Sequence, residues 1–165
     1  MSIIKNILTV QVDAARVAEI LEAVRYDKIG LPGIGSVDFS KIIPIPEHIY
    51  QGNLGSRNIR RYVNNNWIDF CTAHWGSLWN SFGYEEFPPY ETGCDTVRFL
   101  TAGNEVRPVI KALSERFPDA KFIYRWSDEN IGANTGEEGY QHGQCAASYV
   151  PTAGSEESGA LAREI

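Results

Sequence analysis

The order of strand and helix patterns constrains the fold of this chain more than any other feature. The segment from Ile4 to Val12 is rich in β-branched residues and predicts a strand. Asp13 follows where a helix N-cap is expected, and apolar residues then recur at helical spacing as far as Tyr26. The segment from Val37 to Ile43 alternates apolar and polar residues and runs into Pro44-Ile45-Pro46, which predicts a second strand with a proline-fixed exit. The first half of the chain therefore has the order strand, helix, strand.

The second half repeats this order and adds one strand. The segment from Thr96 to Ala102 predicts a strand, and Asn104 is a good N-cap for a helix whose apolar stripe ends at Phe117. The segment from Lys121 to Trp126 predicts a fourth strand, with Phe122, Tyr124 and Trp126 on one face. Several glycines follow, and the segment from Gln144 to Val150 predicts a fifth strand.

A long aromatic insertion, residues 47–92, separates the two halves. It is too long for an ordinary connection, so we expect it to carry structure of its own. Ser56 is placed to cap a short helix, and the segment from Trp67 to Phe82 shows an apolar stripe at helical spacing. Gly76 weakens that pattern, which leaves a single helix and a two-piece element as alternatives.

Together these patterns predict an α+β fold, a ferredoxin-like split βαβ sandwich. Its antiparallel sheet would carry helices on one face and a Trp-rich helical insertion. We expect a single domain over residues 1–151, followed by a C-terminal tail, residues 152–165, that is helical or frayed.

Four segments resemble the YubB-type ferredoxin-like domain family of phage, plasmid and mobile-element proteins. The first is the opening strand preceded by Asn6, the second is the strand ending in Pro44-Ile45-Pro46, and the third is the segment from His74 to Asn80. The fourth is the run from Val97 to Ala102, with its helix ending in Leu113 to Pro118 and a strand closing in Asp128 to Gly132. The resemblance implies the fold and a mobile-element origin. It implies no activity, because that family has no known function and no catalytic motif.

The overall charge and the apolar runs exclude several classes of protein. The formal net charge of −6 argues against a nucleic-acid backbone as the main partner. No apolar run approaches the length of about 20 residues that spans a bilayer, and the start of the chain lacks the pattern of a secretion signal. Three widely spaced cysteines suit a reducing compartment. We therefore expect a cytoplasmic protein with no membrane partner.

Two cysteine–histidine pairs are the candidates for metal chemistry or hydrolysis. Cys71 and His74 form a C-x-x-H pair, and His142 and Cys145 form an H-x-x-C pair, which together supply enough ligands for tetrahedral zinc. The gap between the pairs matches no known finger spacing, and Cys71 also fits the apolar stripe as a core residue. We therefore expect no metal and no cofactor, and a binding protein rather than an enzyme.

A basic and aromatic patch is the alternative candidate. Arg57 and Arg61 in the insertion, with Trp126 on a strand, have the residue types of single-stranded nucleic-acid binding, although no ribonucleoprotein signature occurs. The favoured hypothesis is a small protein-binding module whose partner the sequence does not identify. The expected binding residues are His74, Trp75, Trp79, Asn80, Arg57, Arg61 and Trp126. A core-filling role for the same rings stays open.

Overall fold

The computed structural model describes residues 1–27, 37–83 and 94–165, so the last part of the expected insertion lies outside the described residues. The helices and strands are β1 (Ile3–Gln11), α1 (Ala14–Val24), the 3₁₀ helix η1 (Phe39–Lys41), α2 (Ser56–Arg61), α3 (Trp67–His74), β2 (Thr96–Ala102), α4 (Arg107–Arg116), β3 (Lys121–Asp128), β4 (Thr135–Gln141), β5 (Gln144–Tyr149) and α5 (Glu156–Glu164).

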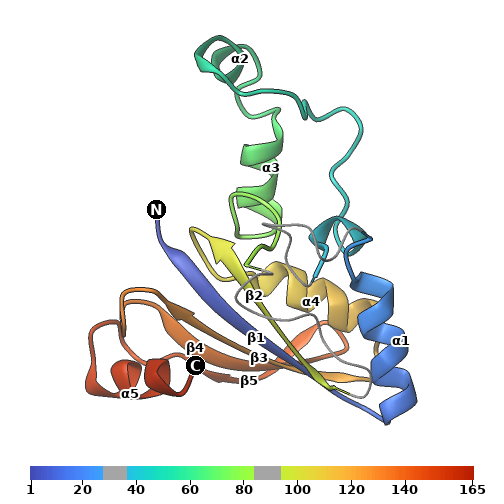
Figure 1. The fold of residues 1–165 in the computed structure, drawn as a ribbon, viewed down its shortest axis with the longest axis vertical. Coiled ribbons are helices and arrows are strands. Elements are labelled where there is room, and N and C mark those ends of the chain that lie inside the picture. The colour runs from blue at the N-terminus through green and yellow to red at the C-terminus, as the bar shows by residue number, and fades with distance from the viewer. Residues whose placement is uncertain (28–36, 84–93) are drawn as a thin grey trace.

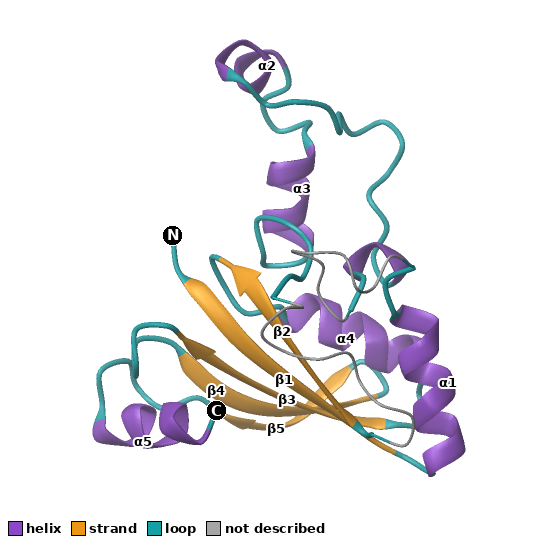
Figure 2. Cartoon of the chain, in the orientation of Figure 1, coloured by secondary structure: helices purple, strands orange, loops and turns teal. Residues whose placement is uncertain are grey.

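The five strands form one antiparallel sheet in the order β2-β1-β3-β4-β5. β2 and β3 flank β1 and are joined through α4, which is the split βαβ arrangement. α4 lies over one face of the sheet with α1 beside it (Figure 2). The expected α+β, ferredoxin-like fold is confirmed. Among the described residues, no helix is both long enough and apolar enough to cross a lipid bilayer.

The main core lies between the sheet and the α1–α4 layer. Alternate residues of a strand point to opposite faces, and Phe122, Tyr124 and Trp126 of β3 are all fully buried on the side of α4. α1 begins as expected, because the Asp13 side chain accepts a hydrogen bond from the backbone N–H of Arg16. The opposite face carries α5, whose Glu164 forms an ion pair of 3.0 Å with Arg125.

The strand predicted over residues 37–43 is wrong. Val37 makes only an isolated bridge with Arg25, and η1 begins two residues later. The reason is local: the carboxylate of Asp38 accepts a hydrogen bond of 3.0 Å from the backbone N–H of Ser40, which favours a turn over a strand. Phe39 is then fully buried in the core instead of alternating along a sheet edge.

The segment that follows α3 lies beside β2, at the edge of the sheet. Leu78 donates a backbone hydrogen bond to Ala102, and Phe82 exchanges two with Leu100. These contacts attach α3 to the sheet through the segment that follows the helix. The predicted stripe from Trp67 to Phe82 is thus a two-piece element, because α3 ends at His74 and is followed by Gly76.

Two further differences concern the second half of the chain. α4 starts at Arg107 after an N-cap at Val106, and not after Asn104. β4 occupies residues in which only glycine-rich sequence was recognised, and Gly136 within it lies against the ring of Trp126. The C-terminal tail contains the helix α5, whose N-cap is Ser155.

Candidate functional site

The helices α2 and α3 form an arm that projects from the sheet (Figure 1). At the base of this arm, α3 meets η1 and the segment that follows α3. A pocket of about 340 Å³, which we call the tryptophan pocket, opens there. Its lining residues are Ser40, Ile45, Gln51, Trp67, Cys71, Trp75, Trp79 and Asn80. This volume is within the range of small-ligand sites.

The three tryptophans have different roles in the pocket. Trp75 is 2% exposed and its indole N–H donates to the backbone carbonyl of Ile43, so it forms a fixed wall. The Trp67 indole N–H likewise donates to the carbonyl of Gly52. Trp79 is 37% exposed, and among the described residues its indole N–H has no hydrogen-bond partner. Trp79 is therefore the ring with a free donor to offer a ligand.

The polar residues of the lining divide in the same way. The amide of Asn80 is occupied, because its oxygen accepts from the backbone N–H of Phe39 and its nitrogen donates to Asp38. Asn80 therefore holds η1 against the segment after α3. Gln51 is exposed, and its amide makes no hydrogen bond within the described parts of the chain. Gln51 and Trp79 together give the pocket polar groups that are free to bind.

Cys71 lines the pocket but has no activated thiol. It is 1% exposed, and burial raises its pKa to about 12, so the thiol stays protonated at neutral pH. A protonated thiol is neither a nucleophile nor a good zinc ligand. His74, one helical turn further along α3, stacks on Phe70 with ring centroids 4.4 Å apart.

The second cysteine–histidine pair lies elsewhere. Cys145 is in β5 and His142 is in the turn before it, whereas Cys71 and His74 are in α3. Burial and the neighbouring Glu138 raise the pKa of the Cys145 thiol. Within residues 1–27, 37–83 and 94–165, no three His, Cys, Asp or Glu side chains converge as a metal site would require. The two pairs are therefore not brought together.

The structure also separates the members of the expected basic and aromatic patch. Arg57 and Arg61 are exposed on α2, in the arm. Trp126 is fully buried in the sheet, and the guanidinium carbon of Arg107 lies 4.7 Å from the centre of its ring. Trp126 has no free face for a base, so it offers nothing to a nucleic acid.

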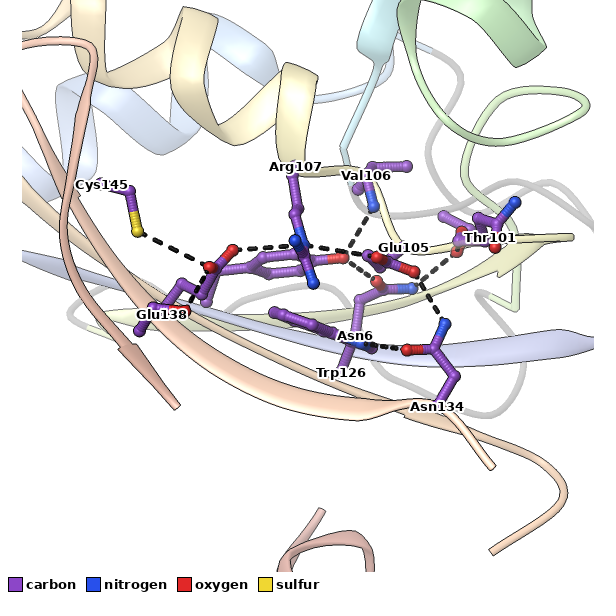
Figure 3. A network of polar contacts seen from close by, with 12 residues as sticks. Asn6, Thr101, Glu105, Val106, Arg107, Trp126, Asn134, Glu138 and Cys145 are labelled. Atoms are coloured by element: carbon purple, nitrogen blue, oxygen red, sulfur yellow. Dashed lines mark hydrogen bonds and ion pairs between the residues drawn. The ribbon is translucent and has the colours of Figure 1, made fainter. Parts of the chain in front are cut away.

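A second polar feature, shown in Figure 3, lies between the start of α4 and the sheet. The Arg107 guanidinium lies between two carboxylates, with its Nε 3.3 Å from Glu105 and 3.2 Å from Glu138. Glu138 is 5% exposed and also accepts hydrogen bonds from Tyr140 and Ser148. Through these contacts the buried Glu138 carboxylate holds α4 to β4 and β5.

The same network continues to the other side of Trp126. The Tyr124 hydroxyl donates to Asn6 and accepts from the backbone N–H of Val106. Burial raises the pKa of Tyr124 well above its ordinary value. The amide nitrogen of Asn6 is occupied by β1 and β2 groups, including Thr101 at 3.0 Å. The bonds of Tyr124 to Asn6 and Val106, and of Asn6 to Thr101, join different structural elements, so we interpret this network as a structural lock.

Sequence reasoning missed the lock because its members are far apart in the chain. Glu138 is on β4, which the sequence pattern did not reveal as a strand. The helix was predicted to begin after Asn104, so Arg107 was not recognised as the first residue of α4. One signal was available: Glu138 and Tyr140 are two residues apart, so in a strand they must lie on the same face.

The sequence model of one protein family matches residues 74–164, which is more than half of the chain. That family is described as the ferredoxin-like domain in Api92-like protein. The chain belongs to this family. The match includes the strands β2 to β5 and the lock residues other than Asn6, whereas β1, α1, η1, α2 and most of α3 precede it.

One solved structure is similar over part of the chain. It is protein api92 from Yersinia pseudotuberculosis, with 16% sequence identity and a TM-score of 0.40. The similar region covers 55% of this chain and 32% of that chain. Among curated proteins, no match is found.

Proposed function

We propose that this chain is a small binding protein whose ligand site is the tryptophan pocket. The observation that carries the proposal is Trp79, a large ring that is 37% exposed and lines a pocket together with two further indoles, and whose indole N–H has no hydrogen-bond partner among the described residues. Tryptophan is enriched at interface hot spots, since one ring buries a large area at little entropic cost. Such a ring is costly to leave in water unless a partner covers it.

The lining defines the chemistry of the ligand. Among the described residues no charged side chain lines the pocket, so a charged group would lose its hydration there without compensation from them. Three indoles favour a flat or apolar group, and the amide of Gln51 adds a donor and an acceptor at the rim. A proline or aromatic side chain with its adjacent peptide group, presented by a protein partner, meets both requirements.

The resemblance to YubB-type proteins supports a phage or mobile-element setting for this partner, with both proteins in the cytoplasm. Single-stranded nucleic acid is the second candidate ligand, because an unpaired base is also flat and rich in hydrogen-bonding groups. The exposed Arg57 and Arg61 on the same arm favour it, and the loss of Trp126 as a stacking ring weakens it.

The test compares three small probes of the pocket by tryptophan fluorescence and by NMR of the probe. N-acetyl-tryptophanamide and N-acetyl-prolinamide represent a protein partner, and thymidine represents a base. We expect the amides to bind the wild-type protein, and Trp79→Ala and Gln51→Ala to weaken binding by about tenfold or more. Ile131→Ala removes another exposed apolar side chain, which is outside the pocket lining, and serves as the control.

Two outcomes contradict the proposal. One is that no amide binds the wild-type protein at millimolar concentration. The other is that Trp79→Ala binds the amides as well as Ile131→Ala does. Tighter binding of thymidine than of either amide would replace the protein partner with a nucleic acid. A pull-down from host cells with wild-type protein and with Trp79→Ala then identifies the partner that depends on the pocket.

A further inference from the structure

The free polar groups of the tryptophan pocket are mainly hydrogen-bond donors. Within the described parts of the chain, neither the indole N–H of Trp79 nor the amide of Gln51 has a hydrogen-bond partner. An indole offers a donor only, whereas an amide offers an NH₂ group and one oxygen. The two side chains together therefore offer more donors than acceptors. A ligand that matches them brings free carbonyl oxygens and few N–H groups of its own.

The position of Gln51 is fixed by its neighbours on both sides. The carbonyl of Tyr50 accepts from the backbone N–H of Trp67 at 2.8 Å, and the carbonyl of Gly52 accepts from the indole N–H of the same tryptophan at 3.0 Å. The Gln51 side chain therefore extends from a backbone segment that the first residue of α3 holds in place. A binding group that is held in advance reduces the entropy lost when a ligand binds.

The indoles of the pocket leave space between one another. The ring of Trp75 contacts Phe39 and Phe70, with centroids 5.6 and 6.4 Å away, and the ring of Trp79 contacts Phe82 at 6.4 Å. Among the ring contacts of the described residues, none joins two of the three pocket indoles. The volume of about 340 Å³ therefore lies between aromatic side chains that are not stacked on each other.

The elements that line the pocket determine which peptide conformation it can bind. The described lining residues come from η1, α3 and connecting segments, and none belongs to a strand, so they offer no strand edge to which an extended peptide could add. A helical peptide uses its carbonyls internally and would leave the donors of Trp79 and Gln51 unpaired. In a polyproline II helix the backbone makes no internal hydrogen bonds, so its carbonyls are free.

We propose that the tryptophan pocket binds a proline-rich segment of a protein partner in the polyproline II conformation. The inference rests on the proposed function, because it names the class of partner for the same pocket. The indole N–H of Trp79 and the amide NH₂ of Gln51 donate to carbonyls of the segment, and its proline rings pack against the indoles. The polyproline II conformation is already formed in the free segment, which lowers the entropic cost of binding.

The same balance of donors and acceptors favours proline over an aromatic side chain in the ligand. Proline has no backbone N–H, so a proline-rich segment brings acceptors without donors. A segment of phenylalanine or tyrosine carries one N–H for each residue. Trp79 accepts no hydrogen bond, and Gln51 has a single amide oxygen to accept from these groups. N–H groups of the ligand that the pocket leaves unpaired would lose their hydration on binding.

The experiment uses the full chain and three acetylated and amidated peptides. The first is hexaproline; the second alternates threonine and phenylalanine over six residues; the third alternates proline and glycine over six residues and has a flexible backbone. Trp79→Phe keeps an aromatic ring but removes the donor, and Gln51→Met keeps an unbranched side chain but removes the amide. Tyr149→Phe removes a donor from another exposed ring, outside the pocket lining, and is the matched control.

Binding is measured by tryptophan fluorescence and by NMR of isotope-labelled indole N–H groups. We expect hexaproline to bind the wild-type protein and Tyr149→Phe equally, and at least about fivefold more tightly than the other two peptides. It should shift the indole N–H signal that is missing from Trp79→Phe. Loss of one hydrogen bond should weaken its binding by about three- to tenfold in Trp79→Phe and in Gln51→Met. Circular dichroism verifies that each variant is folded, as expected for exposed side chains.

Any of three results overturns the inference. Hexaproline binds no more tightly than the threonine–phenylalanine peptide, it binds no more tightly than N-acetyl-prolinamide, or Trp79→Phe binds it as well as Tyr149→Phe does. The single-residue amides separate this inference from the proposed function. If the amides bind in a manner that depends on Trp79 and hexaproline does not bind, the pocket remains a binding site but its partner is not proline-rich. If neither the amides nor hexaproline bind, both proposals are wrong.

Discussion

Gly136 of β4 lies opposite Trp126 of β3, in direct contact with its ring. A Cβ atom at this position would overlap the edge of the indole, so Gly136→Ala forces the ring to move. Overpacking of this kind costs about 1–3 kcal/mol. A displaced ring also loses its indole hydrogen bond to Asn134, worth about 0.5–1.5 kcal/mol. We expect Gly136→Ala to lower the free energy of unfolding by about 2–4 kcal/mol.

The same strand provides a matched control in Gly139. A Cβ atom there would lie 3.5 Å from Lys121 and 3.6 Å from Ile123, which is ordinary packing distance. Gly139→Ala should change the free energy of unfolding little, or raise it by about 0.4–1 kcal/mol through a less flexible unfolded chain.

Urea titration followed by tryptophan fluorescence measures both variants, and near-ultraviolet circular dichroism reports whether the environment of Trp126 has changed. The reasoning is refuted if Gly136→Ala is as stable as Gly139→Ala. It is also refuted if Gly136→Ala loses stability while the near-ultraviolet signal stays that of the wild-type protein, because the loss would then have another cause.

Three further perturbations test the lock and the pocket. Tyr124→Phe leaves Asn6 and the backbone N–H of Val106 without their buried partner and should lower the free energy of unfolding by about 2–4 kcal/mol in urea titration. Burial raises the Tyr124 pKa, so the folded protein keeps the hydroxyl proton above about pH 10, where a tyrosine in the unfolded chain loses it. The free energy of unfolding should therefore fall as the pH rises above about 10. This fall should be less steep in Tyr124→Phe, which lacks the hydroxyl. Cys71, buried and with its pKa raised to about 12, should resist a thiol reagent at pH 8 that labels the two exposed cysteines, as mass spectrometry would show. Asn80→Ala should lower stability by about 1–3 kcal/mol and weaken ligand binding in the pocket, because η1 loses its attachment.

Each of these expectations has an opposite result. If Tyr124→Phe and the wild-type protein have equal free energies of unfolding at neutral pH, the Tyr124 hydroxyl does not stabilise the structural lock. Labelling of all three thiols in the folded protein would contradict the burial of Cys71. If Asn80→Ala is less stable but binds the ligand as well as the wild-type protein does, ligand binding in the pocket does not depend on the attachment of η1.

Local sequence patterns predicted those elements whose causes are also local. The Asp13 cap and the stripe of α1 were predictable because a cap and a helical face involve residues only three or four positions apart. The strand from Thr96 to Ala102 was predictable for the same reason, since its β-branched and aromatic residues are contiguous.

The elements that the sequence did not reveal depend on distant residues. Alternation over residues 37–43 favoured a strand, but Phe39 is drawn into the core by Trp75 and Phe99, with ring centroids 5.6 and 5.7 Å away. β4 contains two glycines, which are unfavourable in isolated strands, and Gly136 is accommodated there because a ring from β3 fills its space. Neither cause is visible within a local window of sequence.

The candidate site was likewise predictable from the sequence only in part. The stretch from Trp67 to Phe82 marked the aromatic region, and Trp75, Trp79 and Asn80 all line the pocket. Their different roles were decided by contacts from other segments. Asn80 is a structural tie because the backbone N–H of Phe39 and the side chain of Asp38 bond to its amide, whereas the indole N–H of Trp79 has no hydrogen-bond partner among the described residues.

The sequence by itself determined the strands β1, β2, β3 and β5, the helices α1 and α4, the α+β class and the aromatic composition of the insertion. Only the tertiary structure decided which rings are walls and which are accessible, that Trp126 is sealed beneath Arg107, and that the arginines of α2 remain without carboxylate partners among the described residues. The physical reason is that periodicity reports which face of an element is apolar, whereas burial and pairing depend on what packs against that face. Those partners lie far away in the chain, such as Ile43 for Trp75 and Asn6 for Tyr124.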